Sequence, residues 1–133
     1  VLGSRILGGK TFDGGMPTYK FFGNHLLNFI QNLFYGVKLS DYATGYKAYS
    51  ATSLANIPYN NNRDDFIFDE ELNTQYVYFG YNLQQVGIPT RYFIEASSVN
   101  FTTSVHYGLL TVFTVIQYIL AKINIYIPKF LRK

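Results

Sequence analysis

The sequence predicts an α/β fold, and three observations lead to this prediction. Apolar residues recur with helical spacing in some stretches and alternate with polar residues in others, so helices and strands follow one another along the chain. Apolar residues make up 48% of the 133 residues, and charged residues make up only 14%, against roughly 25% in an ordinary soluble domain. The chain therefore has enough apolar surface for a packed core, and its length fits one domain or a piece of one.

Composition excludes several classes of protein. The chain has no Cys, which rules out a disulfide scaffold, a Cys-ligated zinc site and thiol catalysis. The net charge of +3 is too small to indicate a nucleic-acid binder. Tyr and Phe are interspersed with few basic residues, which is not the pattern of an RNA-stacking surface. We therefore expect no nucleic-acid partner.

The first elements are a strand, a loop and a helix. Residues 1–7 are expected to form the end of a strand, and residues 8–15 a glycine-rich loop. Pro17 then stands where the first turn of a helix tolerates proline, and Gly36 is a plausible end for that helix. Between them, apolar residues follow at helical spacing: Phe22, Leu26, Phe29, Ile30 and Leu33.

The middle of the chain begins with short elements. Residues 45–50 alternate like a short strand, residues 53–57 fit a brief helix, and residues 58–63 form a loop.

A second longer helix follows that loop. Asp69, Glu70 and Glu71 fall in its first turn, where the helix dipole favours acidic side chains. Its apolar stripe contains Leu72, Tyr76 and Phe79. Gly80 can end the helix, and residues 82–94 then appear extended, with Pro89 indicating a sheet edge or a bend.

The last long apolar stretch has three possible placements. Residues 107–121 carry no charge, and the basic residues that follow are not accompanied by an acid. A membrane-spanning helix needs about 20 apolar residues, and this stretch is shorter. Thr111, Thr114 and Gln117 form a narrow polar stripe at helical spacing, as in a helix that lies in a membrane interface. A helix buried against its own domain and a true span remain open.

The beginning of the chain lacks the features of a secretory signal. There is no initiator Met, no basic segment followed by an apolar one, and no cleavage site. The expected first strand also has no turn before it. We therefore expect the chain to be part of a longer one.

A near match to a phosphate-binding loop is not sufficient to predict one. The loop needs a glycine, four residues and then Gly-Lys-Ser/Thr. Counting back from Gly9-Lys10-Thr11 places Ser4 where that glycine should be, and no apolar strand precedes the motif. A loop that carries Arg5 near a phosphate is the better interpretation.

Asp69 is the best candidate for a catalytic carboxylate. Five of the eight acidic residues lie between Asp64 and Glu71, which can simply be a solvated loop and a charged helix start. The apolar residues 66–68 interrupt this cluster, so Asp69 is expected at the boundary between core and solvent. A carboxylate held there can act as a general base. His25 and His106 have no partner at metal-ligand spacing.

Several short motifs occur in a distinctive order along the chain. They are Gly3-Ser4-Arg5, Met16-Pro17-x-Tyr19-Lys20, residues 39–50 (LSDYATGYKAYS), residues 65–69 (DFIFD), residues 89–93 (PTRYF), residues 95–101 (EASSVNF) and Ser104-Val105-x-Tyr107-Gly108. Together they resemble the C-terminal half of family 2 glycosyltransferases of the dolichyl- or polyprenyl-phosphate sugar transferase type. The resemblance extends to about residue 122.

This resemblance implies a fold and a reaction. The fold would be the C-terminal part of a GT-A fold over residues 1–106, followed by an apolar, basic-ended amphipathic helix and tail over residues 107–133. The reaction would be inverting, metal-dependent transfer of a sugar from a nucleotide-sugar to an acceptor, either a sugar or a polyprenyl phosphate. The complete enzyme would use a divalent metal, Mg or Mn.

The resemblance also implies roles for individual residues. Asp69 matches the catalytic base, and Arg5 is placed to face the donor diphosphate. The remaining matched positions would line the acceptor side: Asp41, Thr44, Gly45, Tyr46 and Arg91.

The sequence departs from the family in one large respect. The donor-binding half of such enzymes, with its Asp-x-Asp metal motif, has no counterpart, and no Asp-x-Asp occurs in these residues. We therefore expect no metal ligands in this chain and no transferase activity from it without an N-terminal half. The alternative function is a non-catalytic module that binds a membrane surface or a partner. In either case we expect a cytoplasmic protein, peripheral at the cytoplasmic face of the membrane.

Overall fold

The computed structural model describes residues 1–8, 18–89 and 101–133, without the side chain of Phe21. The three longest elements in these residues are helices. One lies near each end of the chain, and the third lies between them. The helices are α1 (Thr18–Tyr35), α2 (Ala51–Ala55), α3 (Phe68–Tyr78) and α4 (Phe101–Lys122), the strands are β1 (Leu2–Ser4) and β2 (Gln85–Gly87), and Tyr59–Asn61 and Lys129–Leu131 form 3-10 turns.

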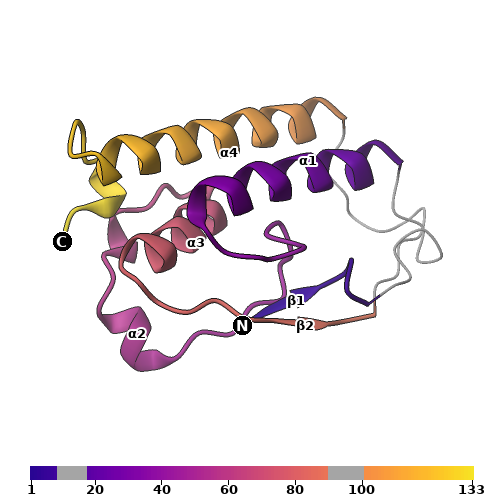
Figure 1. The fold of residues 1–133 in the computed structure, drawn as a ribbon, viewed down its shortest axis with the longest axis horizontal. Coiled ribbons are helices and arrows are strands. Elements are labelled where there is room, and N and C mark those ends of the chain that lie inside the picture. The colour runs from indigo at the N-terminus through magenta and orange to yellow at the C-terminus, as the bar shows by residue number, and fades with distance from the viewer. Residues whose placement is uncertain (9–17, 90–100) are drawn as a thin grey trace.

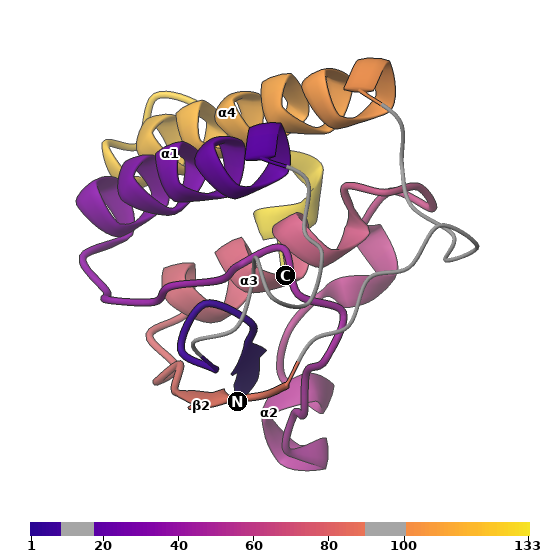
Figure 2. The same cartoon turned by 90° about the vertical axis from the view of Figure 1, so that its right-hand side faces the viewer.

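The elements are arranged in layers. Helices α1 and α4 lie side by side at the top, α3 lies beneath them, and the two strands lie below α3 (Figures 1 and 2). Both α1 and α3 pack against α4. Tyrosines fill much of the space between the layers, and the rings of Tyr35 and Tyr118 meet edge to face at 4.8 Å between centroids.

The sheet is small, and it joins three segments that are far apart in the sequence. Strands β1 and β2 pair in parallel, with Leu2 opposite Gln85 and Ser4 opposite Gly87. On the other side of β1, Leu2 forms an antiparallel bridge with Lys47. The predicted strand over residues 45–50 is thus reduced to one bridge. The described part is a mixed α and β structure, and its assignment to the GT-A fold stays a prediction.

Local sequence signals account for the ends of the helices. Gly36 follows α1 with φ of 71°, and Gly80 follows α3 with φ of 81°, a conformation that glycine adopts without steric cost. Helix α2 begins after Ser50, whose hydroxyl accepts a hydrogen bond from the Ser53 amide at 3.1 Å. Both glycine stops agree with the prediction from sequence. Pro17 and residues 90–94 lie outside the described residues.

Helix α4 turns its polar stripe inward. Thr111 and Thr114 are buried against the layer below, and their hydroxyls donate to the carbonyls of Tyr107 and Leu110 in the preceding turn. The outer face is apolar instead, with Leu109 and other large side chains exposed. The polar stripe that suggests an interfacial helix in the sequence thus faces the protein, and the apolar face of α4 is the exposed one.

The chain reverses after α4 and returns to the domain. Asn124 has φ of 58°, which ends the helix. Phe130 and Leu131 then become buried beside Ala121 of α4. The side-chain amide of Gln75 in α3 donates to the Phe130 carbonyl at 2.6 Å. The C-terminal segment therefore packs between α3 and α4.

Candidate functional site

A groove with a volume of about 650 Å³ lies between α1 and α4. Its walls are mostly apolar, and Arg5, Lys20 and Asp69 bring charges to it. The hydroxyl of Ser104, also on the groove wall, is buried and has no hydrogen-bond partner among the described residues. The groove thus combines an apolar channel with a charged region. Apolar and aromatic lining residues include Tyr19, Leu26, Leu27, Ile30, Phe66, Phe101, Val105, Leu109 and Val112.

Arg5 is held in place by Asp41. The guanidinium donates from Nε to Oδ2 of Asp41 at 2.7 Å and from Nη2 to Oδ1 at 2.8 Å. The backbone amide of Arg5 also donates to Oδ2, at 2.9 Å. The Asp41 side chain is 1% exposed, whereas that of Arg5 is 19% exposed and lines the groove. Such a bidentate pair fixes the plane of the guanidinium as well as its position.

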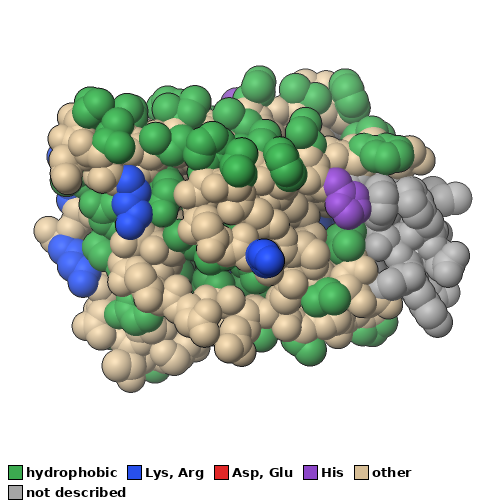
Figure 3. Space-filling model, viewed as in Figure 1, with side chains coloured by type: hydrophobic (Ala, Val, Ile, Leu, Met, Phe, Trp, Pro, Cys, Tyr) green, Lys and Arg blue, Asp and Glu red, His purple; other side chains and the backbone are tan. Residues whose placement is uncertain are grey.

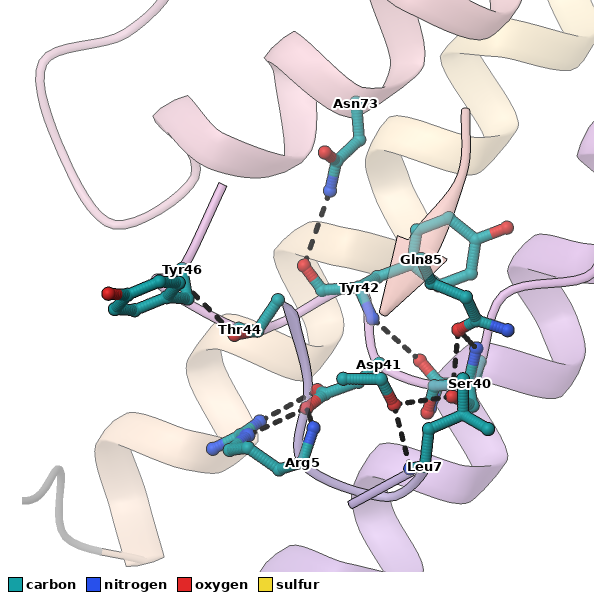
Figure 4. A network of polar contacts seen from close by, with 11 residues as sticks. Arg5, Leu7, Ser40, Asp41, Tyr42, Thr44, Tyr46, Asn73 and Gln85 are labelled. Carbon is teal, nitrogen blue, oxygen red and sulfur yellow. Dashed lines mark hydrogen bonds and ion pairs between the residues drawn. The ribbon is translucent and has the colours of Figure 1, made fainter. Parts of the chain in front are cut away.

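A polar network supports this pair (Figure 4). The hydroxyls of Ser4 and Ser40 lie 2.5 Å apart, and both the amide and the hydroxyl of Ser40 donate to Gln85 Oε1. Asn28 of α1 binds the Ser40 carbonyl and accepts from the Tyr42 amide. These contacts tie β1, β2 and α1 to the loop that carries Asp41.

The other predicted acceptor residues lie on the same loop but differ in exposure. Thr44 is buried, and its hydroxyl accepts from the Tyr46 amide at 3.2 Å. Gly45 and Tyr46 are exposed. Because Asp41 is buried against Arg5, its position assigns it a role in holding Arg5, and its contact with an acceptor stays a prediction. Arg91 lies outside the described residues.

Asp69 stands at the start of α3, as predicted, and borders the groove. Its side chain is 52% exposed. Among the described residues it pairs with Lys47, whose Nζ lies 3.9 Å from Oδ2 and whose side chain is only 5% exposed. The carboxylate is therefore accessible while its cationic partner is buried.

Glu70 follows Asp69 but points the opposite way, into the space between three helices. It is buried, and its two carboxylate oxygens accept from Gln31 Nε2 of α1 at 2.5 Å and from the Tyr107 hydroxyl of α4 at 2.7 Å. Burial, and then the Glu70 charge, raise the pKa of Tyr107 well above its usual value. Glu70 thus links α3 to both walls of the groove.

Sequence reasoning did not single out Lys20 and Lys47 as functional residues. Lys20 lines the groove, and burial followed by the charge of Arg5 lowers its pKa. Two cations close enough to influence each other in an apolar groove make a site for an anion. The available signal for Lys47 was the alternation of residues 45–50, since Tyr46 and Ala48 are exposed while Lys47 and Tyr49 point inward.

No metal site is found in the described ranges. Among residues 1–8, 18–89 and 101–133, no group of three or more His, Asp or Glu side chains could hold a metal ion. The resemblance places the main metal ligands in the N-terminal half of such enzymes, so a divalent metal in a complete enzyme stays a prediction.

Comparison with known proteins adds no relative. No protein-family model matches the chain, and searches of curated proteins and of solved structures give no match either.

Proposed function

We propose that this chain supplies the acceptor side of a family 2 glycosyltransferase and that its acceptor is a polyprenyl phosphate. The observation that carries the proposal is the groove, which joins apolar walls from α1 and α4 to Arg5, Lys20 and Asp69. An isoprenoid chain needs an apolar channel, and its phosphate needs cations at the end of that channel. Apolar walls and cations are present in one groove, and this supports the function that the motif resemblance implies.

The proposed chemistry assigns different tasks to the charged residues. Arg5 and Lys20 bind phosphate oxygens, because charge-assisted hydrogen bonds to phosphate are strong and Asp41 already orients the guanidinium. An oxygen of the acceptor attacks the anomeric carbon of the sugar, and the bond from that carbon to the nucleoside diphosphate breaks. A phosphate acceptor is already an anion and has no proton to lose. Asp69 then orients the acceptor, and it accepts a proton only where the acceptor is a sugar hydroxyl.

The same groove can serve the donor. The resemblance places Arg5 against the donor diphosphate, and that assignment is compatible with a guanidinium that faces the groove. A variant of Arg5 alone would therefore not distinguish a loss of donor binding from a loss of acceptor binding. Variants of Lys20 or of the apolar walls would test acceptor binding, because only the amphiphilic acceptor is proposed to contact them.

The apolar outer faces of α1 and α4 support attachment to a membrane surface. Phe22, Leu26, Phe29 and Leu33 are exposed at helical spacing on α1, and neither α1 nor α4 contains an Asp or a Glu. Figure 3 shows hydrophobic side chains gathered along the edge formed by these helices, and basic side chains near the C-terminal end. Such a surface suits an anionic lipid interface. The stripe on α4 consists of Phe101, Val105, Leu109, Phe113 and Ile116.

An interfacial position fits the fold better than a span. Helix α4 is long and apolar enough to cross a membrane by length and composition. However, its C-terminal end continues into Phe130, which contacts Gln75 of α3. In a spanning helix the two ends lie on opposite sides of the bilayer, so this contact and the packing of α4 on α3 favour a helix that lies on the surface.

The groove is tested by ligand binding to the full chain. Farnesyl phosphate serves as a short acceptor analogue, with farnesol and inorganic phosphate as its two halves. We expect farnesyl phosphate to bind more tightly than either half in calorimetry, and Lys20→Met to weaken it roughly 10-fold or more. Lys38→Met removes one positive charge in the same way but at an exposed position, and it should leave binding unaltered. Equal affinity for farnesyl phosphate and farnesol would contradict a phosphate-acceptor site.

The membrane face is tested by sedimentation with vesicles that contain phosphatidylserine. Phe29→Glu and Phe113→Glu place a charge in the two apolar stripes at positions that do not line the groove, and should abolish most of the pelleting. Ala51→Glu, at an exposed position on α2, is the control. If farnesyl phosphate does not bind but pelleting depends on the two stripes, the alternative of a non-catalytic membrane-surface module is favoured.

The role of Asp69 is tested in an active enzyme that contains these residues. With a phosphate acceptor, Asp69→Asn should retain substantial activity. A loss within the range of about 10²–10⁴-fold would indicate base catalysis and a hydroxyl acceptor.

A further inference from the structure

Lys47 is a buried cation without a hydrogen bond. Its Nζ is shielded from solvent and has no hydrogen-bond partner among the described residues. Within residues 1–8, 18–89 and 101–133, its ion-pair partner is Oδ2 of Asp69, which is 3.9 Å away and too far for a hydrogen bond. A buried ammonium normally has several acceptors, because it loses its hydration on burial. The described part of the chain therefore offers the three N–H donors of Lys47 no acceptor.

Tyr49 repeats this situation two residues further along. Its hydroxyl is buried and has no partner among the described residues. The backbone contacts of residues 46–48 with β1 fix this segment, since the Gly3 amide donates to the Tyr46 carbonyl and the Ala48 amide to the Val1 carbonyl. In an extended segment, alternate side chains point to the same face. Lys47 and Tyr49 thus share the inward face.

Both side chains lie near Asp69. Lys47 reaches it directly, and the charge of Asp69 is, after burial, among the causes that raise the pKa of Tyr49. The resulting group contains an ammonium and a phenol with donors to offer, and one half-exposed carboxylate that borders the groove. It contains more unsatisfied donors than acceptors, which is the arrangement expected of a site for a ligand oxygen that carries negative charge.

We infer that Lys47 and Tyr49 form an oxyanion subsite beside Asp69 that binds a phosphate oxygen of the substrate. This inference rests on the proposed function, since it names a further group that would hold the phosphate in the same groove. An ammonium with three donors can bind Asp69 and a phosphate oxygen together, and its flexible stem lets it turn past Asp69 toward the groove. Phosphate binding would thereby also fix the orientation of Asp69.

Two alternatives explain less of the geometry. If Lys47 served only to stabilise the fold through Asp69, a shorter contact with at least one hydrogen bond would be expected. If the ligand group were a neutral hydroxyl, it would leave the ammonium without a compensating charge. A phosphate oxygen satisfies both the charge and the donors.

The test compares Lys47→Met with Lys38→Met in the full chain. Methionine has nearly the shape of the lysine stem and needs no acceptor, and Lys38 is exposed. Binding of inorganic phosphate and of farnesyl phosphate is measured by calorimetry, and stability by urea denaturation. We expect Lys47→Met to be at least as stable as the wild type and to bind both ligands 10-fold or more weakly. Lys38→Met should change neither property.

Other results separate this subsite from the proposed function. Wild-type affinity for phosphate in Lys47→Met would overturn the subsite, and a loss of stability with unchanged affinity would assign Lys47 to the fold. If inorganic phosphate binding depends on Lys47 but the farnesyl chain adds no affinity, the subsite stands and the polyprenyl acceptor is wrong. If the wild type binds neither ligand, both are wrong.

A second variant covers the case in which Lys47→Met does not fold. Tyr49→Phe removes only a hydroxyl that has no partner in the described part of the chain, so the fold should be retained. We expect it to reduce phosphate affinity several-fold. Unchanged affinity in this variant would remove Tyr49 from the subsite.

Discussion

The two ion pairs beside the small sheet differ in which partner is buried, the acid or the base. At the first, Asp41 is buried, Arg5 reaches the groove, and three hydrogen bonds join them. At the second, the cation Lys47 is buried, the carboxylate of Asp69 is exposed, and no hydrogen bond joins the pair. In the first arrangement both carboxylate oxygens of Asp41 accept hydrogen bonds from Arg5, and these bonds orient the guanidinium at the groove. In the second arrangement the N–H donors of Lys47 are left for a ligand. The first pair therefore holds the site in place, whereas the second pair can bind a ligand.

The largest effect expected from this comparison is on Asp41. Asp41→Ala leaves Arg5 without its carboxylate and should lower the free energy of unfolding by about 3 kcal/mol. Asp69→Asn should lower it by less than about 1 kcal/mol, because that pair is long and half-exposed. Urea denaturation of both variants measures the difference. If both variants lost the same free energy of unfolding, the two ion pairs would contribute equally to stability, and the proposed difference between them would be wrong.

Alkaline pH should destabilise both regions. Burial raises the pKa of Tyr42, next to the first pair, and of Tyr49, next to the second, above the usual 10.0. The folded state then holds the phenolic protons more tightly than the unfolded state, so stability is full below pH 10.0 and falls as the pH rises above it. Unfolding followed by circular dichroism should coincide with the part of the tyrosinate absorbance that is lost in Tyr42→Phe and Tyr49→Phe. Appearance of that part in a chain that stays folded would contradict this coupling.

The same two tyrosines offer a smaller and sharper test. The Tyr42 hydroxyl donates to Asn32 Oδ1 at 2.8 Å, whereas the Tyr49 hydroxyl has no partner among the described residues. Tyr42→Phe should therefore cost about 1 kcal/mol of stability. Tyr49→Phe should stay within about 0.5 kcal/mol of the wild type. A clear loss in Tyr49→Phe would mean that its hydroxyl is bonded within the free chain.

The smallest effect concerns Glu71, which lies outside both pairs. Burial raises its pKa, although the Arg63 amide, which donates to Oε2 at 2.8 Å, opposes this. An acid with a raised folded pKa favours the fold when protonated, so this contribution is lost as the pH rises through the folded pKa. Glu71→Gln keeps the acceptor and should gain less than about 1 kcal/mol at neutral pH. The gain should vanish below pH 4.5, the usual pKa; a gain that persists there would contradict this explanation.

The helices could be predicted from sequence because their signals are local. Gly36 and Gly80 end α1 and α3, and three acidic residues stand in the first turn of α3. Each signal acts within a few residues of the element that it defines. The position of Asp69 at a helix start, between core and solvent, followed from the same local reasoning, whereas the groove that it borders was found only in the structure.

The site itself depends on contacts that no local pattern encodes. Arg5 and Asp41 are separated by 36 residues and meet only because β1 and the loop after α1 are brought together. The inward direction of Thr111 was also not readable, since a stripe of threonines fits water and a packed layer equally well. Its hydroxyl is satisfied by its own helix, so the side chain can be buried at little cost.

The return of the chain after Asn124 has a mechanical consequence. Gln75 of α3 donates to the Phe130 carbonyl, so the last residues are tied to α3. Asp69 lies six positions before Gln75 on the same helix, which is fewer than two turns. A pull on the chain at Lys133 would therefore act on the helix that also positions the Asp69 carboxylate.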